Sequence, residues 1–79
     1  MNSFGEDAIG KWFLYDIDQD MDFTELVYVN NYEHGHYTLT LYTSDGQTYK
    51  NIPITHRHFD TYALSISPEE AMIEKLKRI

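Results

Sequence analysis

From Lys11 the chain alternates apolar and polar positions with a period of two. The apolar positions are Phe13, Tyr15, Ile17, Met21 and Phe23. Between them stand the aspartates at positions 16, 18, 20 and 22. Because successive side chains of a strand point to opposite faces, this alternation predicts a strand, interrupted by a loop over Asp18–Asp22.

Three further strands are predicted over Thr24–Tyr32, His36–Thr43 and Gln47–Ile54, each rich in β-branched or aromatic residues. Gly35 separates the first two. Ser44-Asp45-Gly46 predicts the next hairpin turn, because glycine accepts the positive φ of tight turns. Pro53 cannot donate a hydrogen bond to a neighbouring strand. The last of these strands therefore ends at Pro53 or lies at an edge of the sheet.

The pattern changes after residue 55. Residues 59–66 fit either a short fifth strand or a helical turn. A helix over residues 68–79 is predicted by Ser67 as N-cap, Pro68 at the first helical position and Glu70 completing a capping box. Its apolar residues recur at helical spacing, which predicts a stripe buried against the sheet. These residues are Met72, Ile73, Leu76 and Ile79.

The order of elements predicts a single α+β domain. Four or five strands form an antiparallel meander, either open or curled into a small open barrel, and the C-terminal helix packs on it. The predicted division is a loosely ordered segment over residues 1–10, a sheet over residues 11–55 and the helix over residues 68–79. A chain of 79 residues supports one modest core.

Composition narrows the class of protein. The chain has no cysteine, which excludes disulfides, thiolate metal ligands and a cysteine nucleophile and favours a cytoplasmic location. We expect no signal peptide and no membrane span, because neither the start of the chain nor any apolar run fits one. Phosphate-loop, serine-hydrolase and helical zinc-protease motifs are missing, so we expect no enzymatic activity.

Charge is distributed unevenly along the chain. The net charge is −7, and residues 1–33 hold eight acidic residues and one basic residue, whereas the remainder holds five of each. Phosphate contacts need clustered lysine and arginine, so direct binding to nucleic acid or to an anionic membrane is disfavoured. A larger protein with a basic surface is the partner that this distribution favours.

The acidic residues concentrate in one short segment, at Asp16, Asp18, Asp20 and Asp22. In an extended chain these carboxylates point the same way, about 6.6–6.8 Å apart. A calcium loop of the EF-hand type also needs glycine at its sixth position and glutamate at its twelfth, and registers starting at Asp16 or Asp18 have neither. Two further interpretations are a solvated acidic turn and a surface that imitates nucleic-acid phosphates, as small inhibitors from phages and mobile elements do.

The histidines form two His-x-His pairs, His34 with His36 and His56 with His58. Residues two apart on a strand share a face, so each pair could offer two imidazoles to one ion. Together they would form a four-histidine site for zinc, copper or nickel, in which Glu33 or Asp60 could replace a ligand. A turn at Gly35 would argue against such a site, because the same-face rule fails in turns.

Seven tyrosines are more than a small sheet can bury, and exposed tyrosine is favoured at protein interfaces. We therefore expect Glu25, Tyr28, Tyr32 and Tyr42 to join the four aspartates in binding a partner. The predicted function is that of a small non-enzymatic protein-binding module without a cofactor. In its most specific form it is an inhibitor that blocks a basic nucleic-acid-binding site. The alternatives are a zinc-type metal-binding module and a structural subunit that forms homo-oligomers through the tyrosines or a free sheet edge.

Overall fold

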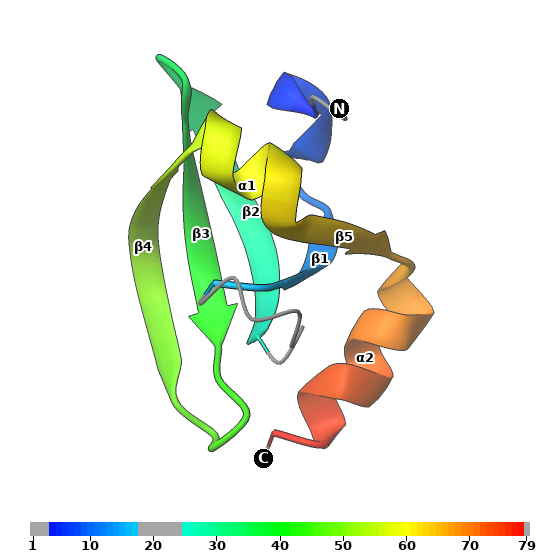
Figure 1. Cartoon of the computed structure of the whole chain (residues 1–79). Coiled ribbons are helices and arrows are strands. Elements are labelled where there is room, and N and C mark those ends of the chain that lie inside the picture. Colours follow the sequence, from blue (N-terminus) through cyan, green and yellow to red (C-terminus); the bar gives the residue numbers. More distant parts are fainter. Residues whose placement is uncertain (1–3, 18–24, 79) are drawn as a thin grey trace.

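An open five-stranded antiparallel sheet, with strand order β4-β3-β2-β1-β5, is the centre of the fold (Figure 1). The structure, a computed structural model, describes residues 4–17 and 25–78. The elements are η1 (Gly5–Ala8), β1 (Trp12–Tyr15), β2 (Glu25–Glu33), β3 (His36–Tyr42), β4 (Thr48–Thr55), α1 (His56–Tyr62), β5 (Ala63–Ile66) and α2 (Pro68–Leu76). The predicted α+β meander with a C-terminal helix is confirmed, and the sheet is not closed into a barrel.

The fifth strand leaves the meander order. Strands β1 to β4 are neighbours in sequence and in space, whereas α1 carries the chain across the sheet so that β5 pairs with β1. Residues 59–66 therefore form the end of a helix and then a strand, which combines the two predicted alternatives. Thr55 caps α1, because its hydroxyl accepts a hydrogen bond from the backbone N–H of His58 at 3.4 Å.

Two tight turns follow from local chemistry. His34 and Gly35 join β2 to β3 with φ values of 51° and 76°, as expected for a two-residue hairpin whose central residues both need positive φ. The next turn is the predicted one at residues 44–46, where Gly46 has φ 91°. There the Thr43 hydroxyl donates to Asp45 and accepts from the backbone N–H of Gln47.

Pro53 lies within β4 opposite Thr38, and β4 is an edge strand. The edge position predicted for this strand is thus confirmed. At an edge, one side of the strand needs no hydrogen-bond donor, so the missing proline N–H is tolerated. A register shift in the β3–β4 pairing accompanies Asn51, which has φ 58°.

The main core lies on the sheet face covered by α1. Alternate residues of β1, β2 and β3 point into it, and Phe59 of α1 is fully buried among them. The Phe59 ring centroid lies 4.5 Å from that of Tyr37 and 5.0 Å from that of Phe13. The buried strand residues of this core are Phe13, Tyr15, Val27, Val29, Tyr37, Leu39 and Leu41.

The N-terminal segment packs against the core over the residues that the structure describes. Ala8 of η1 is buried, and the ring centroid of Phe4 lies 5.0 Å from that of Phe13. The backbone N–H of Gly5 also donates to the Tyr37 hydroxyl at 2.8 Å. Apolar burial and this buried hydrogen bond tie the segment to the core, although its sequence lacks a regular pattern.

The opposite face of the sheet packs against α2. Ser67 caps this helix as predicted, with its hydroxyl accepting the Glu70 N–H at 3.1 Å. Ala71 is the buried residue of the helix, and the Lys75 ammonium lies over the Trp12 and Tyr42 rings at 6.0 and 5.3 Å. The packed side of α2 therefore includes Ala71 and the ammonium of Lys75 over the two rings, and the nearly buried side chain of Arg78, 8% exposed, continues it.

The predicted orientation of this helix is wrong. Met72, Ile73 and Leu76 are exposed by 56%, 56% and 67%, and Ile79 lies outside the described residues. Helical spacing correctly placed these side chains on one side of the helix, but that side is turned away from the sheet. The rotation is set by Ala71, which allows close approach, and by Lys75, which covers the aromatic rings beneath it.

Candidate protein-binding surface

Asp16 cannot belong to an exposed acidic surface, because it is only 1% exposed. It follows β1 directly, and its backbone N–H donates to the Tyr62 carbonyl at 3.0 Å, which continues the pairing toward β5. Burial, and then the charge of Asp16, raises the pKa of the Tyr15 phenol. The prediction that Asp16 contacts a partner is therefore wrong. Asp18, Asp20 and Asp22 lie outside the described residues, and Glu25 is half-buried at the start of β2.

The three tyrosines expected at an interface do not share a surface. Tyr28 and Tyr42 lie on the α2 side of the sheet, with ring centroids 4.8 and 5.8 Å from that of Trp12. Tyr32 lies on the α1 side, where its ring centroid is 4.7 Å from that of buried Tyr37. A register shift between Val29 and Asn31 moves Tyr32 to the other face, where strict alternation would have kept it with Tyr28. All three side chains are half-buried.

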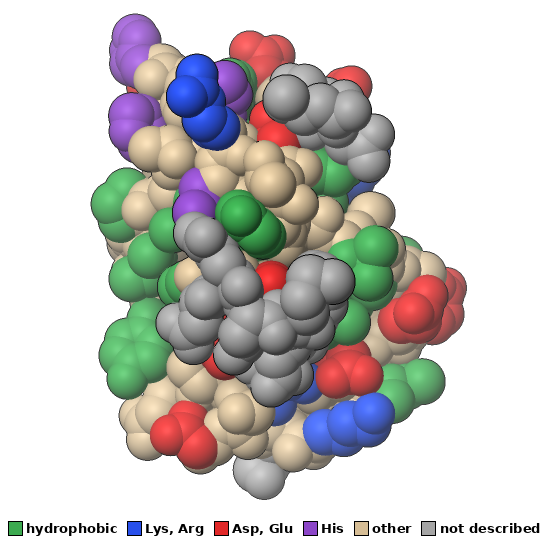
Figure 2. Space-filling model, in the orientation of Figure 1, with side chains coloured by type: hydrophobic (Ala, Val, Ile, Leu, Met, Phe, Trp, Pro, Cys, Tyr) green, Lys and Arg blue, Asp and Glu red, His purple; other side chains and the backbone are tan. Residues whose placement is uncertain are grey.

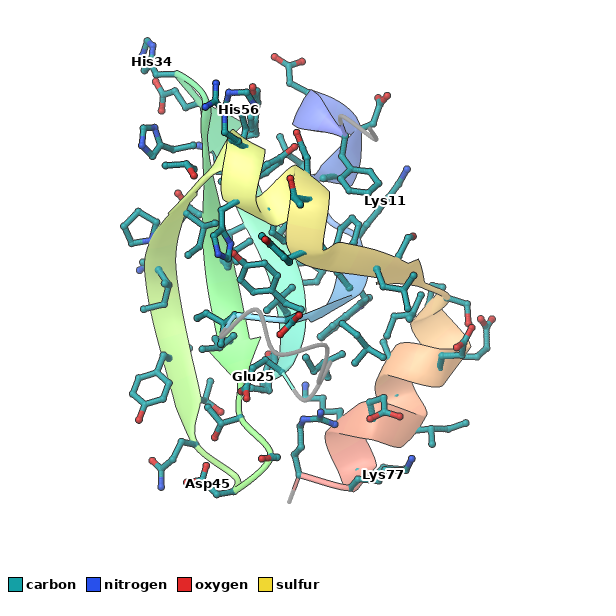
Figure 3. All side chains as sticks on the ribbon, viewed as in Figure 1. Lys11, Glu25, His34, Asp45, His56 and Lys77 are labelled. Carbon is teal, nitrogen blue, oxygen red and sulfur yellow. The ribbon has the colours of Figure 1, made fainter. Side chains whose placement is uncertain are left out.

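Three of the four histidines gather at one end of the molecule. His34, His36 and His56 line a shallow hollow of about 450 Å³, together with Gly35, Thr55 and Arg57. Figure 2 shows histidine side chains at this end beside a basic side chain, and Figure 3 places His34 and His56 there. The cause is the pairing of β3 with β4, which brings the turn before β3 next to the residue that follows β4.

The fourth histidine points elsewhere. The Nδ1 atom of His58 forms a hydrogen bond with the Tyr15 hydroxyl. The His58 ring centroid lies 4.8 Å from that of Tyr62. His34 and His56 have carboxylate neighbours instead, at 3.3 Å from Glu33 and 3.7 Å from Asp60. The two pairs therefore do not converge on one four-histidine site. Within residues 4–17 and 25–78, no group of three or more histidines and carboxylates is arranged to hold a metal ion.

A buried polar network next to the histidine hollow was missed by sequence reasoning. Asp60 is 7% exposed and accepts hydrogen bonds from the Tyr37 hydroxyl at 2.8 Å and from the Phe4 N–H at 3.5 Å. Burial, followed by the hydrogen bond to Asp60, raises the pKa of Tyr37. These contacts join the N-terminal segment, β3 and α1. We assign this network a structural role, because its hydrogen bonds connect different elements of the fold.

The outward side of α2 holds three of the large apolar side chains that are exposed on the described residues. Of the six large apolar side chains exposed among the described residues, four lie between residues 64 and 76. They are Leu64 of β5 and Met72, Ile73 and Leu76 of α2, which we call the α2 face. In Figure 1, α2 forms an outer side of the molecule. The sequence pattern identified the stripe but assigned it to the core.

Charged groups surround the α2 face. Glu69 and Glu70 are exposed in the first turn of α2, and Lys77 follows its last turn. Glu74 pairs with Arg78 at 2.9 Å and with Lys77 at 3.2 Å. The hydrogen bonds from Arg78 and Lys77 lower the pKa of the Glu74 carboxyl. The apolar side chains thus lie between two acidic residues at one end of α2 and, at the other, Lys77 and Arg78 paired with Glu74.

No protein family, curated protein or solved structure matches this chain. Across the described part of the chain, no helix combines the length and apolar character needed to cross a bilayer.

Proposed function

We propose that this protein acts by non-covalent binding of other proteins and not by catalysis. The observation that carries the proposal is the α2 face, with its exposed apolar stripe on one side of a regular helix. Burying one such side chain completely is worth about 1.5–3 kcal/mol, so leaving three on the outside of a helix forgoes a large stabilisation. Exposed apolar patches of this kind are typical of binding surfaces.

We further propose that one partner is a larger cytoplasmic protein with a basic surface. The support is the charge distribution, since residues 1–33 carry the entire net charge of −7. In its most specific form, the protein is an inhibitor that occupies a basic nucleic-acid-binding site in place of phosphates. With Asp16 buried, the acidic surface in this proposal consists of Asp18, Asp20, Asp22 and half-buried Glu25.

Affinity capture from the native host, read by mass spectrometry, tests the role of the α2 face. The parent protein is compared with an Ile73→Lys/Leu76→Lys variant and with a Tyr49→Lys control. Tyr49 is 48% exposed on β4, so the control changes an apolar surface residue away from α2. We expect the α2 variant to lose at least one partner that the control retains. Identical partner sets for all three proteins would contradict the proposal.

A second variant tests the acidic surface. Replacing Asp18, Asp20 and Asp22 by asparagine removes three charges and nearly preserves side-chain shape. We expect partner affinity to fall, with the largest difference at low salt, where charge steering is strongest. Equal affinity for the parent and the asparagine variant at both low and high salt would show that the inhibitor proposal is wrong, while the α2 face would stay a separate candidate.

A further inference from the structure

The α2 face has the pattern of a helix that packs against another helix. Glu69, Met72, Ile73 and Leu76 stand at positions i, i+3, i+4 and i+7, which places them on one side of α2. Ala71, the buried residue of the helix, faces the sheet on the other side. The helix therefore has a sheet-facing side with Ala71, Lys75 and, after its last turn, the nearly buried Arg78 side chain, and a separate apolar side that no described residue covers.

Leu64 is a further exposed apolar side chain, on the strand that precedes α2. It pairs with Leu14, which pairs in turn with Leu26, and these side chains share the sheet face on which α2 packs. The strand that holds Leu64 is β5, an edge strand of the open sheet. The elements β5 and α2 are consecutive along the chain, and Leu64 is 53% exposed.

The charged residues at the two ends of α2 indicate which partner fits the α2 face. Glu69 and Glu70 are exposed at the start of α2, and the Lys77 side chain, 63% exposed, lies at its other end (Figure 3). Two copies of a nine-residue helix, about 13 Å long, would bring acid opposite base at both ends if they packed antiparallel. A parallel pair would bring like charges together. In a two-fold symmetric contact, each surface must complement itself. An apolar centre between opposite charges meets this requirement.

The net charge does not prevent this contact. The chain carries −7, which opposes self-association, but residues 34–79 hold five acidic and five basic residues. Both β5 and α2 belong to this electrically balanced part. The residues of the contact itself therefore add no net charge that would oppose it.

We propose that the protein forms a symmetric dimer in which the α2 helices of two copies pack antiparallel, with Leu64 at the edge of the contact. This inference rests on the proposed protein-binding role of the α2 face and names its occupant as a second copy of this chain. A stable interface of standard size buries about 800 Å² on each partner, and four partly exposed side chains supply only part of this area. The expected dissociation constant is therefore micromolar, about 1–100 μM.

Sedimentation equilibrium from about 5 μM to about 1 mM tests the dimer. The parent mass should rise from 9.4 kDa toward twice that value. The Ile73→Lys/Leu76→Lys variant should stay monomeric throughout, with the melting temperature of the dilute parent, because both side chains are exposed. The Tyr49→Lys control should dimerise like the parent. A monomeric parent at about 1 mM, or a dimer that is lost in the control and kept in the α2 variant, would overturn the proposal.

Charge exchange tests the antiparallel arrangement. A Glu69→Lys protein and a Lys77→Glu protein should each dimerise more weakly than the parent, because each places like charges together twice. An equimolar mixture should regain the parent's dimerisation, because acid and base face each other again at both ends. If neither variant is weaker, or if mixing restores nothing, the antiparallel contact is wrong.

Failure of the dimer can be separated from failure of the binding role. If the parent is monomeric and the Ile73→Lys/Leu76→Lys variant loses a host partner, self-association is wrong and the protein-binding role stands. If the parent is monomeric and that variant keeps every partner, both proposals are wrong.

Discussion

Two substitutions test the rotation of α2 about its axis quantitatively. One changes the size of a buried helix residue, and the other changes the size of an exposed one. Ala71 is 1% exposed and Leu76 is 67% exposed. Adding the larger side chain in Ala71→Leu forces overpacking between helix and sheet, which should lower the free energy of unfolding by about 1–3 kcal/mol. Only a third of Leu76 is removed from water, so Leu76→Ala should cost less than about 1 kcal/mol.

Urea unfolding followed by circular dichroism measures both values. For a small domain with a slope near 1 kcal/mol/M, Ala71→Leu should lower the midpoint by about 1–3 M and Leu76→Ala by less than about 1 M. The protein should be kept near 2 μM, because a dimer contact at Leu76 would add stability that depends on concentration. A loss of about 2–4 kcal/mol in Leu76→Ala with a neutral Ala71→Leu would mean that the apolar stripe faces the sheet and that our reasoning is wrong.

Two further predictions concern the core and the charged end of α2. Phe59→Ala should lower the free energy of unfolding by about 3–5 kcal/mol, which is much of the roughly 4–12 kcal/mol expected for a chain of 79 residues. A denaturant melt that shows a loss under about 1 kcal/mol would place Phe59 outside the core. Glu74→Gln should lower the free energy of unfolding at pH 7 by less than about 1 kcal/mol, the upper end for accessible ion pairs, because Arg78 and Lys77 lower the folded pKa of Glu74. The stability that such a carboxylate contributes is present above its unfolded pKa and is lost as pH falls through its folded pKa. The difference in free energy of unfolding between the parent and Glu74→Gln should therefore narrow below about pH 4.5 and vanish in more acid solution. A difference that stays constant down to about pH 3 would refute this assignment.

The α2 face was predicted only in part from the sequence. Helical spacing grouped Met72, Ile73 and Leu76 correctly, because spacing along a helix determines which residues share a side. Spacing carries no information about which neighbour that side meets. The small size of Ala71 and the aromatic rings under Lys75 decide this, and both act only once the helix lies on the sheet.

The arrangement of the tyrosines and histidines differs from the sequence pattern for a related reason. Strand alternation holds as long as the ladder is regular, and the register shift between Val29 and Asn31 breaks it before Tyr32. The His-x-His spacing describes neighbours along the chain, yet a tight turn separates His34 from His36, and α1 directs His56 and His58 to different surroundings. A bulge of this kind depends on pairing with another strand, so it carries a weak local signal.

The sequence by itself determined the class of fold, the strands and turns of the meander and the cap of α2 at Ser67, and it limited Pro53 to a strand end or an edge strand. These features depend on periods of two and 3.6 residues and on the stereochemistry of a few residues, which act over short distances along the chain. Only the tertiary structure decided the crossing of the chain through α1 to β5, the burial of Asp16 and the outward direction of the α2 stripe. Each of these depends on contacts between segments far apart in the sequence, where packing overrides local pattern.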